Sequence, residues 1–135
     1  AADRLINVPI VKHHSLSRVT LGMKNWMGAV EDRRFWHRNN LHQCIADFST
    51  FIKPAWTIID ATRIMMDKGP QGPANTLKTP DLLVVSKSQV AADGHAATLF
   101  HDDPRKVKYM ALAEEMGMGV IDIAQMNVHR VEVGV

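Results

Sequence analysis

Residues 40–60, NLHQCIADFSTFIKPAWTIID, contain the signal for a helix followed at once by the signal for a strand. Asn40 can accept hydrogen bonds from first-turn amides, Gln43 stands at the reciprocal capping position, and Pro54 ends the run. The apolar residues between them recur at helical spacing: Leu41, Cys44, Ile45, Phe48, Phe51 and Ile52. Residues 55–60 are branched and apolar, which predicts a buried strand. Such a pair is typical of α/β folds.

The same alternation extends through the chain. We expect strands at 4–11, at 81–86 and, as an edge strand, at 127–133. Helices are expected from Leu16 to Val30, from Gln89 to Phe100 after a Ser88 cap, and before Gly117. The charged stretch 31–39 and the Gly/Pro-rich stretch 68–76 are expected to be loops. The sequence predicts a single α/β domain with a mainly parallel or mixed sheet and helices packed on its faces.

Composition narrows the function classes. With 135 residues, 46% of them hydrophobic, the chain can bury the core of one domain. A net charge of +2 with scattered basic residues disfavours nucleic acid, and no apolar run has the length of a membrane span. We expect a soluble domain, cytoplasmic by default, with export of the parent protein left open. Because the chain starts without Met, it reads as a fragment or excised domain of a longer protein.

The single cysteine, Cys44, excludes an internal disulfide and any iron–sulfur cluster or thiolate zinc site ligated by this chain alone. Its position on an apolar helical stripe predicts a core residue and not a nucleophile. The sequence assigns no cofactor, and a divalent metal is one that the remaining side chains could bind.

Candidate site residues follow from the rule that open α/β sheets bind ligands beyond the carboxyl ends of their strands. The residues at the predicted strand ends are Lys12, His13, His14, Asp60, the loop 69–72, Ser86, Lys87 and Ser88. We expect them to line one rim. Neighbouring side chains on a strand point to opposite sides, so one of the two histidines should face the rim. The alternative is an ordinary solvated strand end.

Each of these residues also has a purely structural interpretation. Asp60 could act as a base or metal ligand, or could cap a turn or pair with Arg63. Lys24 lies off the apolar stripe of its predicted helix and is either a ligand contact or a solvated lysine. Asp93 lies on an inward stripe, where it would bind backbone amides or a lysine.

Two further features carry weaker signals. His37 and His42 are five residues apart, a spacing that favours two surface histidines over a shared metal. The GPQGP segment at 69–73 lacks the Lys and hydroxyl residue of a phosphate-binding loop, so a tight turn is the simpler interpretation.

Several stretches together resemble a known family. Residues 7–28, NVPIVKHHSLSRVTLGMKNWMG, are similar to the Lys-x-His, Thr and Lys-Asn-x-x-Gly pattern of the domain-of-unknown-function family 362, and the resemblance continues through 45–73, 90–100 and 108–119. The matching positions are Lys12, His14, Lys24, Asn25, Gly28, Asp60, Gly69, Pro70, Gly72 and Asp93. His13 falls at a variable position. Ser88-Gln89 stand where the family commonly has Asp-Pro.

The resemblance implies an uncharacterised α/β protein associated with iron–sulfur chemistry. Full-length members usually carry a preceding α/β segment, and many carry a cysteine-rich ferredoxin-like module. This chain resembles the second half of such a protein. The resemblance therefore implies, as partners, a ferredoxin-like module or the other half of the parent protein.

The leading hypothesis is a strand-end rim of Lys12, His14, Lys24, Asn25 and Asp60 that binds an anionic small molecule or a metal-bound ligand. In it the lysines neutralise the anion, and His14 and Asp60 act as acid and base or as metal ligands. One alternative is a non-catalytic docking domain for a cluster-bearing partner, with an exposed apolar patch near Phe35, Trp36 and methionines. Another is a metal-dependent hydrolase using His13, His14 and Asp60, with His37 or His42 as a further ligand.

Overall fold

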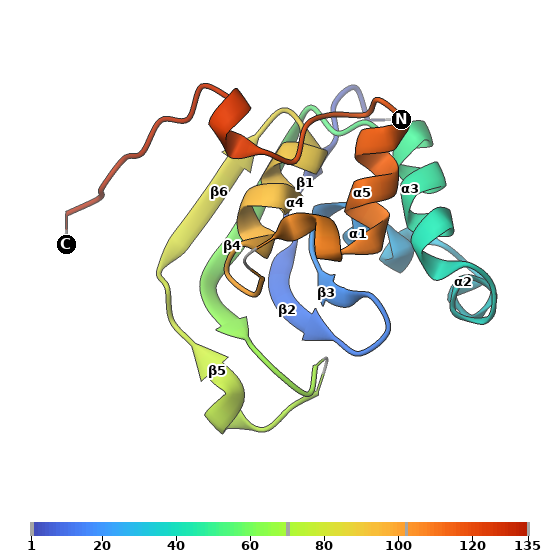
Figure 1. The fold of residues 1–135 in the computed structure, drawn as a ribbon, viewed down its shortest axis with the longest axis horizontal. Helices are drawn as coiled ribbons and strands as arrows, with labels where there is room; N and C mark the ends of the chain where they lie inside the picture. Colours follow the sequence, from blue (N-terminus) through green and yellow to red (C-terminus); the bar gives the residue numbers. More distant parts are fainter. Residues whose placement is uncertain (1, 70, 102, 135) are drawn as a thin grey trace.

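The computed structural model describes residues 2–69, 71–101 and 103–134, and Figure 1 shows their arrangement. The sheet has six strands: β1 (Ile6–Asn7), β2 (Ile10–His14), β3 (Arg18–Thr20), β4 (Trp56–Met65), β5 (Leu77–Lys78) and β6 (Leu82–Ser86). The α-helices within the described ranges are α1 (Gly22–Asn25), α2 (Arg33–Arg38), α3 (Leu41–Phe51), α4 (Gln89–Ala97) and α5 (Lys108–Glu115).

β4 is the centre of the sheet. On one side β1 and β2 pair with it in parallel, with Ile10 aligned with Asp60. On the other side β5 and β6 pair with it in antiparallel fashion. β3 folds back on β2 as an antiparallel hairpin. The α/β class is confirmed, and the sheet is mixed.

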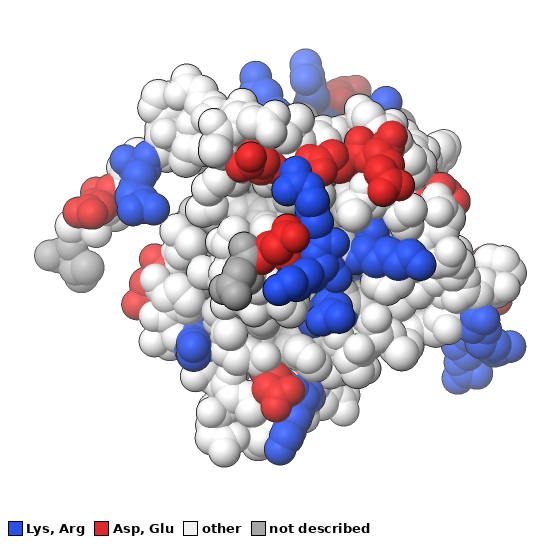
Figure 2. All heavy atoms as spheres, viewed as in Figure 1, with Lys and Arg blue, Asp and Glu red and all other residues white. Residues whose placement is uncertain are grey.

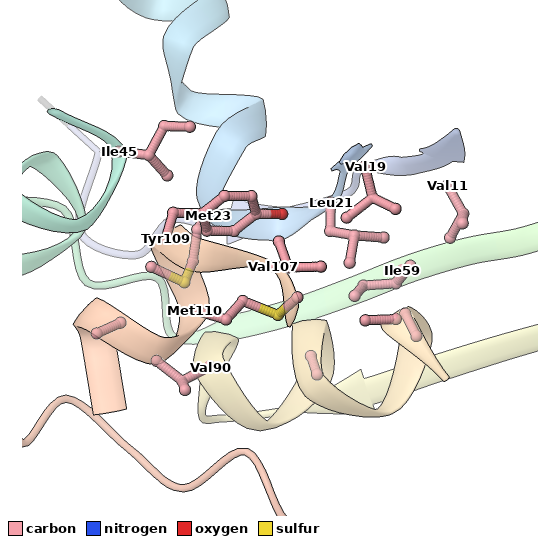
Figure 3. Packing of buried hydrophobic residues seen from close by; sticks show 14 of the residues in the cluster. Val11, Val19, Leu21, Met23, Ile45, Ile59, Val90, Val107, Tyr109 and Met110 are labelled. Carbon is pink, nitrogen blue, oxygen red and sulfur yellow. The ribbon is translucent and has the colours of Figure 1, made fainter. Parts of the chain in front are cut away.

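The helices gather against one face of this sheet. Ile59, Ala61 and Ile64 of β4 are buried on that face, where α4 packs on β4 and β6. Figure 3 shows Tyr109 and Met110 of α5 meeting side chains from the strands and from α4 in one core. Alternation along β4 turns its other residues away from the helices.

The expected helix signals at three positions are confirmed. The Asn40 side chain accepts a hydrogen bond from the Gln43 amide at the start of α3, and Ser88 accepts one from Ala91 at the start of α4. The Gln43 side chain donates to Asp47 and so does not close the reciprocal cap. Gly117, with φ of +72°, follows α5 in the left-handed conformation that glycine adopts most easily.

Two local predictions in the first third of the chain are wrong. The expected helix from Leu16 is a hairpin turn and β3, followed by the short α1 and a 3₁₀ helix, Trp26–Ala29. Val19 is buried on β3 and Met23 on α1, so the helical spacing of these residues did not reflect a single helix, and Leu16 is exposed. The stretch 31–39 contains α2, because Asp32 caps it by accepting from the Phe35 amide.

The expected edge strand at 127–133 is also wrong. These residues form no strand and are exposed, and Figure 1 shows the segment extending away from the sheet. The strand order β1-β4-β2-β3 ends instead at β1 and β3, and β5 and β6 pair with the other side of β4. An alternating pattern is compatible with a strand, but a strand also needs a neighbour whose backbone it can pair with.

The face of the sheet that points away from the helices is apolar and exposed. Ile6 aligns with Trp56, Ile58 with Val85, and Asp60 with Leu83, so these side chains share one surface. We call this surface the outer sheet face, defined by Ile6, Val8, Ile10, Trp56, Leu83 and Val85. Ile10 and Leu83 are each 58% exposed. Isolated exposed apolar residues are ordinary, whereas a contiguous patch marks an interaction surface.

A search of the described helices for a membrane-crossing segment found none of sufficient length and apolarity.

Candidate anion-binding site

The first turn of α1 is held from outside the helix by Asp93 of α4. The Gly22 amide donates to Asp93 Oδ1 at 2.7 Å, and the Met23 amide donates to Oδ2 at 2.9 Å. Asp93 is fully buried, and burial raises its pKa to about 7 although both hydrogen bonds lower it. The structural interpretation of Asp93, bonding to backbone amides, is therefore the one that the geometry supports.

Asn7 extends this anchor to β1. Its Nδ2 donates to the Gly22 carbonyl at 2.8 Å, and its Oδ1 accepts from Asn25 Nδ2 at 2.8 Å. Asn25, a candidate ligand contact, thus uses its amide nitrogen to brace α1. Gly22 lies so close to this network that an added Cβ would be 2.7 Å from Asp93 Oδ1.

Lys24 extends from this braced helix. Only 7% of the residue is exposed, and burial followed by the charge of Lys12 lowers its pKa to about 8. Within the described residues the one ion pair joins Arg105 and Glu114, so neither lysine has a carboxylate partner there. A largely buried ammonium group beside a second cation and without a carboxylate attracts anions.

His14 adds a neutral hydrogen-bond donor next to these charges. Its Nδ1 accepts from the Leu16 and Ser17 amides at 3.2 and 3.3 Å, which leaves the proton of the neutral ring on Nε2. Burial first, then Lys24, lowers its pKa to about 4. The His37 ring lies 5.9 Å from the His14 ring, centroid to centroid.

We call Lys12, His14, Lys24 and His37 the cationic cluster. The charges of Lys24, His37, His13 and Lys12, in that order, add to the effect of burial on the pKa of His14, which indicates that these side chains lie near its ring. We leave His13 out of the cluster because its Nδ1 accepts from the Gly69 amide. Three of them, Lys12, His14 and Lys24, are strand-end or helix candidates from the sequence. His37 comes from α2, which the sequence reading took for a loop.

His13 and the loop after β4 form a structural contact. Gly69 donates its amide to His13 Nδ1 at 3.1 Å, and a Cβ at Gly69 would collide with the His13 carbonyl. The Gly72 amide approaches Met65 Sδ at 3.3 Å. These amides are therefore engaged within the protein. Pro70, which the resemblance also selects, lies outside the described residues.

Asp60 lies on the face of the sheet that points away from the helices, and so does not join the cationic cluster. It aligns with Ile10 and Leu83 on the outer sheet face, in the middle of β4 and not at its end. Its Oδ1 accepts from the Thr62 amide at 2.9 Å and from the Thr62 hydroxyl at 2.7 Å, and these bonds lower its pKa. The turn-capping interpretation of Asp60 fits this geometry.

The remaining rim residues lie elsewhere. Ser86 aligns with Thr57 because β6 runs antiparallel to β4, so Ser86, Lys87 and Ser88 are at the opposite end of the sheet. Lys87 places its Nζ 5.2 Å from the Trp56 ring centre. Gly28 has open space where a Cβ would be.

Metal-ligating side chains do not converge in the described part of the chain. No group of three or more His, Cys, Asp or Glu residues there is arranged to hold a metal ion. The hydrolase hypothesis requires His13, His14, Asp60 and a further histidine around one ion. That arrangement is not formed, since Asp60 faces away from the helices and both histidines accept backbone hydrogen bonds at Nδ1.

Comparison with known proteins assigns the family. Residues 1–98 match the model of the family described as Domain of unknown function (DUF362). The chain belongs to this family. The DUF362 match runs from β1 through α4, and it includes the whole cationic cluster together with the Asp93 anchor.

A curated relative is the Thylakoid-associated protein sll1697 of Synechocystis sp. It is 27% identical over 125 residues, a match that covers 87% of this chain and 38% of that protein. The DUF362 chain thus spans well under half of this relative's length. No solved structure matches the chain.

Sequence reasoning missed several contributors to the site. Asn7 braces α1, and Thr57 and Tyr109 bury hydroxyl groups for which the described residues offer no hydrogen-bond partner. Tyr109 has a pKa raised well above its ordinary value, chiefly by burial and then by Asp93. Asn7 is the last residue of the short strand β1 and Tyr109 lies inside the helix α5, and neither position carries a local signal for these roles.

Proposed function

We propose that this DUF362 chain is an anion-binding α/β domain whose cationic cluster holds a small carboxylate or phosphate compound. The observation that carries the proposal is Lys24: a lysine 7% exposed, next to Lys12 and without a carboxylate partner among the described residues. A bound anion would supply the missing counter-charge. It would also favour the protonated form of Lys24.

The cluster residues have separate roles in this proposal. Lys12 and Lys24 neutralise the ligand, while the Nε2–H of His14 donates one directed hydrogen bond to it. The Asp93 and Asn7 anchor fixes α1, so that Lys24 does not have to be ordered when the ligand binds. A ligand that arrives bound to a metal would have to bring most of the metal's ligands itself.

Calorimetry tests the proposal with citrate and inorganic phosphate as separate probes. Lys12→Gln and Lys24→Gln should each weaken binding about tenfold, because each removes a charge-assisted contact. Lys78→Gln, an exposed lysine on β5, is the matched control and should bind as the parent does. Elemental analysis of the purified domain measures its metal content and so tests whether the ligand carries a metal. Equal binding of both probes to all variants would refute the cluster as the site.

A second candidate function, an assembly domain, is favoured by the outer sheet face. Six exposed apolar residues lie together on that face, whereas Trp36 is buried and Phe35 is exposed. As occupant we propose the polypeptide that accompanies this region in longer relatives, since the match covers 38% of the Synechocystis protein. In such a protein a further layer would cover the second face of the sheet. The redox or iron–sulfur association implied by the resemblance would then reside in that additional polypeptide.

The assembly function is tested by mixing the domain with the unmatched part of the Synechocystis relative. Amide hydrogen exchange at β6 should slow on mixing, and the pair Leu83→Lys with Val85→Lys should abolish the effect. Val128→Lys, in the exposed C-terminal segment, is the control. Unchanged exchange at β6, or protection caused by a second copy of this chain, would contradict the proposed occupant.

A further inference from the structure

A second basic surface lies between the β2–β3 hairpin and the segment that leads into α5. There a cleft of about 590 Å³ is lined by His13, Ser15, Leu16, Arg18, His42, His101, Lys106 and Lys108. Figure 2 shows Lys and Arg side chains gathered near the middle of this face of the molecule. Among the described lining residues there are two lysines, one arginine and no carboxylate. The cleft shares no residue with the cationic cluster.

Arg18 occupies this cleft at a conformational cost. Its φ is +66°, in the left-handed region where residues other than glycine are strained. The hairpin between His14 and Arg18 could be closed at that position by Gly or Asn without this cost. Residues held in such conformations cluster at functional sites, which makes Arg18 a candidate for such a role. Lys68 and Asp81 also have a left-handed φ, but neither lines the cleft.

His42 links Arg18 with Lys108 across the cleft. Burial, then Lys108 and, more weakly, Arg18 lower the pKa of His42, while a backbone hydrogen bond with Leu16 raises it. Both cations therefore act on the same ring. His42 Nδ1 is buried and has no hydrogen-bond partner in the part of the chain that the structure describes. Two carboxylates in this part of the chain have partners of their own: Glu114 pairs with Arg105 at 3.0 Å, and Asp103 accepts from the Arg105 amide at 2.9 Å.

We propose that this cleft binds the phosphate group or groups of a phosphorylated small molecule, through Arg18, Lys106 and Lys108. Three fixed positive charges suit a multiply charged oxyanion, and the planar guanidinium group of Arg18 matches two phosphate oxygens at once. The volume exceeds that of one phosphate and falls within the range of small-molecule sites. The cleft adjoins the cationic cluster at the hairpin, where the lining residue Leu16 donates its amide to His14, but the proposal uses no side chain of the cluster and does not depend on the function proposed for it.

The test is a titration of the ¹⁵N-labelled chain with inorganic pyrophosphate at constant ionic strength. Saturable shifts are expected at the amides of the hairpin, Ser15 to Arg18, and at Lys106 and Lys108. Arg18→Gly and Lys108→Gln should each weaken the apparent affinity about tenfold. Lys78→Gln should leave it unchanged. The amide spectrum of each variant without ligand verifies that it is folded.

Two further measurements test whether the cleft is a separate site and whether it recognises phosphate. Lys24→Gln should retain the pyrophosphate shifts in the hairpin, and a loss of them would show that the cleft is not a separate site. Malonate should bind more weakly than pyrophosphate, and equal binding would contradict recognition of phosphate. Shifts that grow linearly without saturation, or that persist unchanged in Arg18→Gly and Lys108→Gln, would overturn the proposal.

Discussion

Asp93 of α4 accepts a 2.7 Å hydrogen bond from the amide of Gly22, 71 residues earlier in the chain, and so acts as the cap of a helix to which it does not belong. α1 has only one turn, too short to be stable alone. The position of Lys24, and with it the geometry of the cationic cluster, therefore depends on a carboxylate from another element.

The anchor predicts a large effect for Asp93→Asn. The amide side chain keeps one acceptor but turns an NH₂ group toward a backbone N–H, so the free energy of unfolding should fall by about 2–4 kcal/mol. Urea denaturation measures this change. Asp47→Asn, an exposed residue of α3, is the control and should alter stability by less than about 0.5 kcal/mol. Equal stability of the two variants would contradict the capping role.

The same carboxyl predicts a pH dependence. Because the folded pKa of Asp93 is about 7 against an ordinary 3.8, its contribution to stability is fully present below pH 3.8 and is lost as the pH rises through about 7. The stability difference between the parent and Asp93→Asn should thus shrink between pH 5 and pH 8. A difference that is constant or grows across this range would show that the pKa is not raised.

His14 predicts the opposite slope at acid pH. Its folded pKa of about 4 lies below the ordinary 6.5, so its contribution is present above pH 6.5 and is lost as the pH falls through about 4. His14→Gln should flatten this acid limb in thermal unfolding. His129→Gln, in the exposed tail, should keep the limb of the parent. Identical limbs for all three proteins would refute the buried neutral His14.

Adding a side chain at Gly69 should cause a steric clash, and the same change at Gly28 provides the control. A Cβ at this position would collide with the His13 carbonyl, so Gly69→Ala should destabilise the protein by about 1–3 kcal/mol and free the His13 ring. Gly28→Ala meets open space and should leave stability unchanged or slightly raised. The two are compared by urea denaturation, and a tolerated Gly69→Ala would mean that the loop does not dock on β2.

Replacing Arg18 should weaken ligand binding while leaving the free energy of unfolding nearly unchanged. Arg18→Gly relieves the left-handed φ of +66° at about 1 kcal/mol and increases the freedom of the unfolded chain by a similar amount, so stability should change by less than about 1 kcal/mol. Its affinity for pyrophosphate should nevertheless fall. A strongly destabilised Arg18→Gly would mean that the side chain serves folding and not ligand binding.

The parts of the fold that could be predicted are those whose capping residues and apolar pattern lie next to one another in the sequence. α3 has its cap at Asn40, and the strand ending in Ser86 precedes a helix capped by Ser88, so neighbouring residues suffice to define both. The hairpin after His14 was missed because its left-handed residue is Arg18, where glycine or asparagine would have marked a turn.

Part of the candidate site could also be predicted from residues that lie close together in the sequence. Lys12 and His14 were expected just after the strand at 4–11 and lie in the last part of β2, and the family resemblance added Lys24, so three of the four side chains that meet there are sequence candidates. Ser86 was placed on the same rim because the direction of a strand cannot be read from its own residues, and β6 runs antiparallel to β4. Asp60 was misplaced because β4 continues five residues further, to Met65, on the alternation that turns Asp60 away from the core.

The most direct test of the anion-binding function is the pKa of the Lys24 ammonium group, followed by NMR of its side chain with and without saturating citrate. The ligand-free pKa should be about 8, and citrate should raise it, because a bound anion stabilises the charged form. The side-chain signals of Lys78, which is exposed on β5, are the control and should not change when citrate is added. A Lys24 pKa that is near its ordinary 10.5 without ligand, or that citrate leaves unchanged, would contradict the account.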